Sequence, residues 1–483
     1  MAYTATDKAI SFFRPYNHTG TGSSGTVTDV GFTPDMFWHK NRANNQGHGL
    51  IDSVRGNGNY ISPNTTNAQL SDVGSYGITS GGFTFPNGDA FFNGSGNQII
   101  FWSWLMGGTA PTKTYKVVVV SDSGNKYRFR NSTDTATFGA SAVTLDLQEG
   151  GTYTFDVSDS TMNSHPFVIG TAANSSEYST GVTYKLDGVT KTYSQYTSGF
   201  SAATSRQLII TVPASAPALY YWCSQHSGMG GAINTNATFG SSNFDGNIQS
   251  LVSANTTAGI SVVRYTGDGN ASATIGHGLG GKIDQIWQKD LTATDSWHIF
   301  SKGMTSGYNL YFNNDGTNQN PGDGSIDNFT TTTFGFNANG GNVNAVNENN
   351  IPCICYCFRS VTGFSSFGTY KGNNNSVNGP MVYTGFKPTS ILVKKMDASG
   401  GYWVWSDNKR NSRSDTNGNG ADRWLYVNTS DVEFDAGSYP VDLLSMGFKF
   451  KHNGNYQNGN NTYIYAAFGQ SVVGSNNVPA TAR

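Results

Sequence analysis

The same set of landmarks occurs three times along this chain, and that repetition restricts the fold more than any other feature of the sequence. Each copy places a Gly-Phe pair ahead of an apolar closing strand, and the distance between the two hardly changes. The stretches 83–104, 336–358 and 448–468 span 21, 22 and 20 positions from that Phe to an aromatic residue of the closing strand. Similarity of this kind within one chain indicates three copies of one structural unit.

A separate segment interrupts the series between its first and second copies. Lys40, Lys289 and Lys394 occupy matching positions in the three copies, and they are 249 and then 105 positions apart. The surplus of 144 positions is close to the length of a small domain with its linkers, and it falls between Gly108 and about Ser241. The sequence therefore predicts a domain inserted between two repeats.

Short strands joined by turns are expected throughout. Glycine accounts for 60 of 483 residues, aromatic residues for 13% and charged residues for only 12%. Apolar runs bounded by Gly, Asn and Pro favour strands, and no amphipathic helix stands out. A repeat of about 105 residues is long enough for a core of its own. We therefore expect an all-β protein, with jelly-roll or lectin-like β-sandwiches at 1–108, 241–360 and 361–483 and a different β-domain at 112–236.

Charge and targeting signals exclude several classes of partner. With 29 Lys and Arg against 31 Asp and Glu, the formal net charge is −2, so no basic surface for nucleic acid is expected. No apolar run is long enough to span a bilayer, and the N-terminal stretch lacks the features of a signal peptide. Three of the four cysteines alternate along one stretch, 353–357, where geometry disfavours a disulfide. The chain is expected to be made in a cytosol and to fold without disulfides.

One short stretch of the inserted domain carries the most specific chemistry. Cys223, His226 and Met229 are spaced as Cys-x2-His-x2-Met, and His165 lies upstream. One thiolate, two imidazoles and a weak axial thioether make the ligand set of a blue-copper site. The alternative is a loop of the same shape without metal, in which His165 is a packed histidine and Cys223 a small buried hydrophobe.

Catalytic patterns are weaker. The cysteines at 353–357 lack the Cys-x2-Cys spacing of zinc sites, so they are expected to be core residues on one face of a strand. Asp35 and Asp52 are the candidates for the paired carboxylates of a glycosidase. However, the third repeat has Thr389 where the first has Asp35, and no nucleophile elbow or phosphate loop occurs. We expect no enzymatic activity.

Aromatic residues are candidates for sugar stacking, but most of them are expected in the core because they lie within predicted strands. The loops at 57–60 and 453–456, each with one tyrosine among polar residues, are better candidates for exposed contact; their alternative is a plain turn. The tryptophans in question are Trp38, Trp102, Trp104, Trp287, Trp297, Trp403, Trp405 and Trp424.

Both parts of the chain resemble known families. The strings at 31–42, 52–56 and 81–84 resemble repeats of structural proteins of marine tailed phages, often described as tail-fibre or lectin/glucanase-like proteins. The first repeat matches best and the second most loosely. The stretches 150–157 and 218–229, together with His165 and its neighbours, resemble a cupredoxin-like domain. The second resemblance implies a Greek-key β-sandwich, with His165, Cys223, His226 and Met229 as the copper ligands.

The phage resemblance implies a virion structural protein made in the host cytoplasm. The function expected first is a tail-associated appendage or fibre component that presents β-sandwiches for host-surface adhesion. Other virion proteins of the tail or capsid, further copies of the same chain and a host-surface glycan are the implied partners, with no nucleic acid and no membrane insertion. The alternatives are a capsid decoration protein that stabilises the head surface and, more weakly, a capsule-degrading glycosidase.

Overall fold

The computed structural model describes residues 9–71, 76–107, 110–236, 240–319, 321–410, 420–435, 437 and 440–470. Strands and turns make up nearly all of this part, so the predicted all-β class is confirmed. The longest helix of the described residues, α1 (Tyr193–Gly199), has seven residues. None of the described helices is long and apolar enough to cross a membrane.

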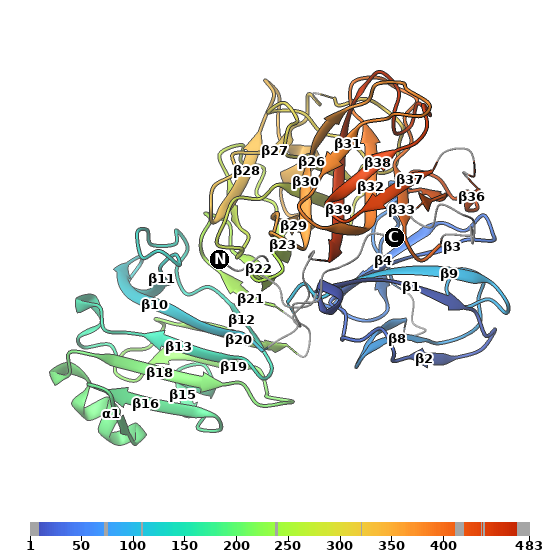
Figure 1. The fold of residues 1–483 in the computed structure, drawn as a ribbon. Coiled ribbons are helices and arrows are strands. Elements are labelled where there is room, and N and C mark those ends of the chain that lie inside the picture. Colours follow the sequence, from blue (N-terminus) through green and yellow to red (C-terminus); the bar gives the residue numbers. More distant parts are fainter. Residues whose placement is uncertain are drawn as a thin grey trace. The chain divides into compact units, whose positions relative to one another are not determined.

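The chain divides into two compact units (Figure 1). Unit 1 consists of Met1–Gly108, Ala254–Ser272 and Leu279–Arg483, and unit 2 of Thr109–Ser253 and Ala273–Gly278. The segment expected as an inserted domain, 112–236, lies within unit 2, and unit 1 consists of the repeats without 241–253 and 273–278 of the second repeat, which belong to unit 2. The expected domain limits at Met1, Gly108 and Arg483 lie outside the described residues, and the division into four domains stays a prediction.

Each repeat of unit 1 builds its main sheet in the same order. The closing strand lies between the first strand and the strand that carries the matched lysine, and the next strand pairs on the far side of the latter. The main sheets run β1 (Phe13–Thr19), β9 (Gln98–Trp104), β3 (Met36–Asn41), β4 (His48–Asp52) in repeat 1; β23 (Ile260–Thr266), β29 (Pro352–Phe358), β25 (Gln285–Asp290), β26 (His298–Ser301) in repeat 2; and β30 (Ser365–Lys371), β39 (Thr462–Gln470), β32 (Lys387–Lys395), β33 (Val404–Asp407), β35 (Arg423–Tyr426), β36 (Phe434–Asp435) in repeat 3.

A smaller sheet faces each main sheet and completes a sandwich. In repeat 1 the rings of Phe37, Phe83 and Phe101 stack between the two layers, with Phe83 and Phe101 centred 4.3 Å apart. The strands of the smaller sheets are β2 (Gly25–Val27), β8 (Gly82–Phe85), β7 (Gly77–Thr79); β28 (Thr333–Asn337), β27 (Ser325–Asp327); and β31 (Met381–Tyr383), β38 (Gly447–Phe450), β37 (Val441–Leu444), β34 (Gly420–Ala421). Short elements complete the repeats: η1 (Ala9–Ser11), β5 (Asn59–Tyr60), β6 (Leu70–Ser71) and α2 (Asn344–Asn347).

The central strands of the main sheets are buried on both faces. All six residues of β3 are buried. Phe37 points into the core of its own repeat, whereas the next residue, Trp38, contacts Trp287 of repeat 2 and Trp405 of repeat 3, with ring centroids 5.9 and 4.9 Å away. The three repeats therefore share a central aromatic core in addition to the cores within the sandwiches. This double burial explains why these strands appear in the sequence as unbroken apolar runs rather than alternating ones.

Hydrogen bonds between the repeats follow one another around a closed ring. In each repeat a backbone N–H donates to the carbonyl that lies two positions after the matched lysine of another repeat. These bonds are Gln69 to Leu291 (2.8 Å), Asn318 to Met396 (2.9 Å) and Glu433 to Arg42 (2.8 Å). The repeats thus meet as three subunits of a cyclic oligomer would, although one chain supplies all of them.

A second set of contacts has the same cyclic pattern. In each repeat, a turn joins the strand with the matched lysine to the next strand of the main sheet. The side chain of a residue at or immediately before the start of that next strand contacts a backbone carbonyl of a neighbouring repeat. These contacts join His48 Nε2 to Tyr426 O (2.9 Å), Trp297 Nε1 to Ser62 O (3.1 Å) and Trp403 Nε1 to Tyr311 O (2.8 Å). Two independent sets with one symmetry indicate that the repeats are related by an approximate threefold axis.

The matched lysines are structural. The side chains of Lys40, Lys289 and Lys394 are buried, and each ammonium donates to backbone carbonyls at or after the end of its strand. The shortest of these bonds go to the carbonyls of Asn41, Asp290 and Gly401, at 2.6, 2.7 and 2.6 Å, respectively. Burial lowers the pKa of Lys40 to about 8 and that of Lys394 to about 7. The residue that marks the repeat in the sequence therefore organises a loop from inside the protein.

Unit 2 is a sandwich of two mixed sheets. One sheet runs β11 (Asn125–Phe129), β10 (Thr112–Ser121), β13 (Thr152–Asp156), β18 (Arg206–Thr211), β16 (Val182–Leu186), β17 (Val189–Lys191), and the other β12 (Leu145–Gln148), β20 (Gly231–Asn236), β19 (Leu219–Cys223), β14 (Phe167–Ala172), β15 (Ser175–Glu177). The other elements are η2 (Ser160–Met162), η3 (Phe200–Ala202), β21 (Ser241–Asn243), β22 (Ser250–Asn255) and β24 (Thr274–Gly276).

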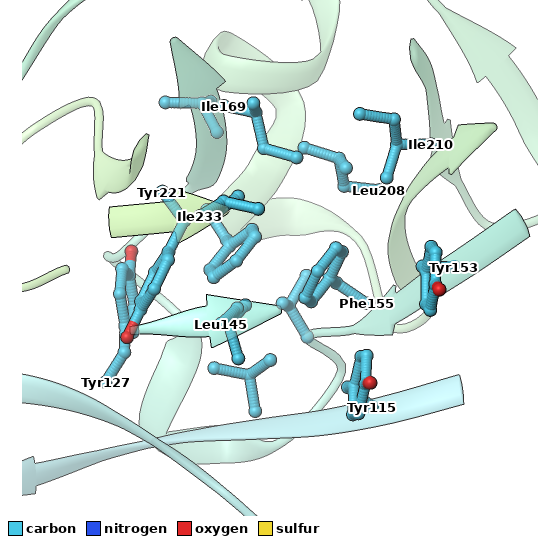
Figure 2. Packing of buried hydrophobic residues seen from close by; sticks show 14 of the residues in the cluster. Tyr115, Tyr127, Leu145, Tyr153, Phe155, Ile169, Leu208, Ile210, Tyr221 and Ile233 are labelled. Atoms are coloured by element: carbon cyan, nitrogen blue, oxygen red, sulfur yellow. The ribbon is translucent and has the colours of Figure 1, made fainter. Parts of the chain in front are cut away.

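One apolar core fills the space between the two sheets of unit 2. Burial alternates along β13 and β19, as it does in strands with one face in the core and one outside. Figure 2 shows Phe155 and Leu208 of one sheet and Ile169, Tyr221 and others from the second sheet packed in this core. The same packing holds rigidly the strand ends that carry the candidate metal ligands.

Candidate metal centre

Two neighbouring strands of unit 2 bring His165 and Cys223 to the same end of a sheet. β14 begins at Phe167, β19 ends at Cys223, and the antiparallel register pairs these two residues directly. His165, two positions before β14, therefore lies beside the loop that follows β19. That loop carries His226 and Met229.

Three donor atoms converge at this strand end. The Nδ1 atoms of His165 and His226 are 3.0 Å apart. The Sγ of Cys223 lies 3.9 Å from the first of these nitrogens and 3.5 Å from the second. Elsewhere in the described ranges no group of three or more His, Cys, Asp or Glu side chains gathers its ligand atoms in this way. The structure thus brings together three of the four predicted ligands.

The site is buried on one side and open on the other. Cys223 is 2% exposed and His165 8%, whereas His226 is exposed. Burial, and secondarily the nearby charge of His226, lowers the pKa of His165, which favours the neutral imidazole that a metal requires. Met229, the fourth predicted ligand, is 1% exposed and belongs to the core of unit 2.

Tyr127 of β11 ties the two halves of the site together. Its hydroxyl donates to the carbonyl of His165, and its backbone N–H donates to the carbonyl of Met229, both at 2.9 Å. Sequence reasoning did not select Tyr127, because it occupies an ordinary inward position of an alternating strand. The role of Tyr127 becomes visible only in the structure, where β11 lies against the loop that carries Met229.

The free nitrogen of His165 also has a neighbour. The side-chain amide of Asn125 lies 3.4 Å from His165 Nε2. The two ends of an asparagine amide are assigned from their hydrogen bonds, and with its oxygen toward the ring the amide would accept the Nε2 proton. In that tautomer Nδ1 of His165 is unprotonated, and its lone pair is available to a metal beside Cys223 and His226.

Glycines allow the loop to close over the site. Gly228 has a φ of 72°, in the left-handed region, and Gly230 lies so close to β19 that a Cβ would come within 1.8 Å of the Tyr221 carbonyl oxygen. The Lys126 ammonium donates to the Gly228 carbonyl. The position of Met229 between these glycines is therefore set by backbone geometry.

The remaining cysteines lie in the core of unit 1. Cys353, Cys355 and Cys357 on β29 are at most 1% exposed, so the prediction that they are core residues is confirmed. Burial raises the pKa of all three thiols. Thiols of this kind are poor nucleophiles and poor metal ligands.

The two candidate carboxylates are buried and already bonded. Asp35 accepts hydrogen bonds from the backbone N–H groups of Met106 and Gly107, at 2.8 and 2.9 Å, and burial raises its pKa to about 6. Asp52 forms an ion pair with Arg55 at 2.5 Å and lies in the interior of unit 1. Both carboxylates hold backbone and side chains in place.

The aromatic residues follow the sequence prediction closely. All eight tryptophans considered for sugar stacking are at most 2% exposed, so their assignment to the core is confirmed. In the two candidate contact loops, Asn57 and Asn455 are exposed, and Tyr60 and Tyr456 are half-buried. These loops therefore keep accessible polar atoms next to one partly accessible ring.

Comparisons with known proteins identify a family. A family model described as a domain of unknown function (DUF7483) matches residues 8–143 and 194–471. No curated protein and no solved structure matches the chain. Cys223, His226 and Met229 lie within the matched residues, whereas His165 lies between the two matched stretches. Because the match covers well over half of its length, the chain belongs to the DUF7483 family.

Proposed function

We propose that unit 2 is a copper-binding domain and that unit 1 is a structural scaffold. The single observation that carries the copper proposal is the convergence of two imidazole nitrogens and one sulfur at the end of β14 and β19. Their separations of 3.0, 3.5 and 3.9 Å match those of donors that share one ion, because metal bonds to nitrogen and sulfur are about 2.0–2.3 Å long.

The donor set selects a soft transition metal. A Cys thiolate with two imidazoles favours copper or zinc over magnesium and calcium, and a thioether on the same loop favours copper. Cys223 would supply the thiolate, His165 and His226 the nitrogens, and Met229 a weak thioether contact. A bound copper ion would add a redox-active centre with soft Lewis acidity. Tyr127 and Asn125 would hold the ligands in place, as outer hydrogen-bond partners of metal sites do.

The cupredoxin-like identity of unit 2 belongs to the same proposal. Two mixed sheets packed face to face, with the ligands at one end of two adjacent strands, support it. The competing possibility is the same loop without metal, in which His165 and Cys223 serve packing alone.

Copper loading of the purified full-length chain tests the proposal. We expect one copper per chain by elemental analysis and an intense visible absorption from thiolate-to-copper(II) charge transfer. Cys223→Ala should abolish both, and Cys353→Ala, which removes a buried thiol of β29, should abolish neither. A wild-type chain that binds no stoichiometric copper, or a Cys223→Ala variant that binds as well as wild type, would leave the metal-free loop as the explanation.

We also propose that the chain is a virion structural protein, first as a tail-associated appendage for host-surface adhesion. The closed ring of three repeats favours a rigid presenting scaffold, since its strands and loops are tied by contacts between repeats. The burial of Asp35 and Asp52 argues against the glycosidase alternative, because a catalytic pair must reach the substrate. Other copies of the chain, tail or capsid proteins and a host-surface glycan are the partners proposed with this role.

Cryo-electron microscopy of intact particles would separate the tail and head alternatives. Density for the repeat ring on the tail would support adhesion, and density over the head lattice would support decoration and remove the adhesion role. Heating the particles gives an independent test. Loss of infectivity with an intact shell after the protein is stripped indicates adhesion, and loss of shell stability indicates decoration.

A further inference from the structure

Three half-buried tyrosines form a cluster on repeat 3, and the contacts described above for the metal site and the ring do not use their side chains. Tyr402 precedes β33, Tyr426 ends β35, and Tyr456 lies in the loop between β38 and β39. Their ring centroids are 4.8 Å apart for Tyr402 and Tyr426, 5.0 Å for Tyr402 and Tyr456, and 5.8 Å for Tyr426 and Tyr456. We call these three residues the tyrosine patch.

The hydroxyls of the tyrosine patch are available. Within the described part of the chain none of the three forms a hydrogen bond, although each ring packs against the others. Burial raises the pKa of Tyr426 and of Tyr456, and the nearby charges of Asp431 and Asp315, respectively, add to the effect. Each of these two hydroxyls therefore stays protonated and can both donate and accept.

The other two repeats provide an internal control. Matching bonds align them: the N–H of His48, Trp297 and Trp403 donates to the Asn64, Asn313 and Asn428 side chains, respectively. In this alignment Tyr402 corresponds to Gly47 and Ser296, and Tyr426 to Ser62 and Tyr311. Repeat 1 thus folds without a tyrosine at either position, whereas repeat 2 has a tyrosine, Tyr311, at the second one. Tyr402 is therefore the residue that distinguishes repeat 3 from both other repeats.

The surroundings of the tyrosine patch are aromatic and acidic. Phe434 on β36 is 42% exposed, and its ring stacks toward Tyr426 at 6.2 Å. Asp315 and Asp431 are exposed. The cations close to these groups are buried or paired: Lys394 is bonded to three carbonyls, Arg423 pairs with Asp435, and Lys395, near Asp315, is 2% exposed. The accessible groups of the site are therefore ring faces, hydroxyls and carboxylates.

We propose that the tyrosine patch binds a neutral glycan. A sugar ring has an apolar face that stacks on aromatic rings and a rim of hydroxyls that bond to tyrosine hydroxyls and carboxylates. Uronic-acid and sulfated chains are disfavoured, since Asp315 and Asp431 would repel them. The proposal names the ligand class for host-surface adhesion, and its biological meaning rests on that proposed function. Glycan binding itself can be measured on the purified chain.

A glycan array with the full-length chain, followed by calorimetry, tests the site. The probes are neutral oligosaccharides of glucose, mannose, galactose and N-acetylglucosamine, with polyuronate and heparin fragments as acidic comparators. We expect binding to a neutral probe only. Tyr402→Ser and Tyr426→Ser, which introduce the residues found at these positions in other repeats, should each weaken binding about tenfold. Phe434→Ala should weaken binding by a smaller factor. Tyr383→Ser, at a tyrosine of β31 that is 65% exposed, is the matched control and should bind as wild type does.

Each other outcome overturns the proposal. No neutral probe bound, binding to acidic probes alone, or equal loss in Tyr383→Ser and Tyr402→Ser would exclude the tyrosine patch as the site. Thermal melting checks that the variants fold. If a tyrosine variant does not fold, Phe434→Ala, which changes an exposed side chain, still tests the site. Copper content and the position of the chain in a particle are measured separately, so failure here is distinguishable from failure of the proposed function.

Discussion

Repeats 1 and 3 contain a buried ion pair that repeat 2 lacks. Asp52 pairs with Arg55, and Asp407 pairs with Arg410, each pair three positions apart and fully buried. A residue from another repeat completes each pair. Tyr356 of repeat 2 donates to Asp52 at 2.6 Å, and Trp102 of repeat 1 donates to Asp407 at 3.0 Å.

At the third junction every part of this arrangement is replaced. Ser301 pairs in register with Gln285 as Asp52 does with Met36, and Met304 stands where the arginine would be. The donor position, filled by Trp102 and Tyr356 elsewhere, is Ala466. Repeat 2 therefore lacks the aspartate and the arginine, and the neighbouring repeat lacks the side chain that would donate a hydrogen bond to the aspartate. A buried carboxylate without partners is costly, so the arrangement is kept or lost as a whole.

Removing the base from one junction should have the largest effect. Arg410→Met leaves the Asp407 carboxylate buried without its partner and also removes bonds to Glu433 and to the Trp405 carbonyl. We expect a loss of about 3–5 kcal/mol in the free energy of unfolding, measured by urea denaturation of the full chain. The matched change in repeat 2, Met304→Leu, should cost less than about 1.5 kcal/mol. Equal losses would mean that the ion pair contributes nothing beyond packing.

The ion pair can be rebuilt in repeat 2. Ser301 is fully buried, so Ser301→Asp alone should destabilise the chain by about 3 kcal/mol through an unpaired carboxylate. Adding Met304→Arg should recover more than half of that loss, because the spacing of the two positions matches Asp52 and Arg55. Urea denaturation of both variants measures the recovery. A double variant no more stable than the single one would show that the repeat 2 junction has a different geometry.

The smallest effect concerns a feature that all three repeats share. Burial lowers the pKa of Lys394 to about 7 in the folded chain, against 10.5 for an ordinary lysine. Between pH 7 and pH 10 the unfolded chain therefore binds more protons than the folded one, and stability rises with pH. This lysine adds at most about 1.4 kcal/mol per pH unit. Thermal melts across this window should show a shallower rise for Lys394→Met.

The control for the pH effect is an exposed lysine. Lys302→Met changes a side chain that is 64% exposed and should keep the wild-type slope of stability against pH. A Lys394→Met slope equal to that of Lys302→Met would contradict a depressed pKa for the buried ammonium. The same comparison can be made with Lys40, whose pKa is lowered to about 8.

Much of the fold was accessible to sequence reasoning because its signals are local. Apolar runs between turn residues predict strands, and the recurring lysine and closing strand predict three copies of one unit. The spacing of Cys223, His226 and Met229 is likewise contained in one loop. His165 is 58 residues from Cys223, and it was selected as the second imidazole of the ligand set and by the family resemblance; the register of β14 and β19 supplies the geometric basis.

The ring could not be predicted in the same way. Asp52 and Tyr356 are 304 positions apart, and Trp102 and Asp407 are 305. No local pattern links such positions, and strands buried on both faces lose the alternation that would reveal which side faces another repeat. The sequence therefore suggested one core for each repeat and was silent about the shared one.

Local residue patterns were enough to predict the all-β class, the threefold repetition, the placement of the inserted segment and the ligand types of the candidate metal centre. Each of these depends on residue type and short-range spacing, which chain connectivity preserves. Contacts between distant parts of the chain set the closure of the repeats around Trp38, the burial of Asp35 and Asp52, the role of Tyr127 and the cluster of Tyr402, Tyr426 and Tyr456. These depend on which distant surfaces meet, and only packing determines that.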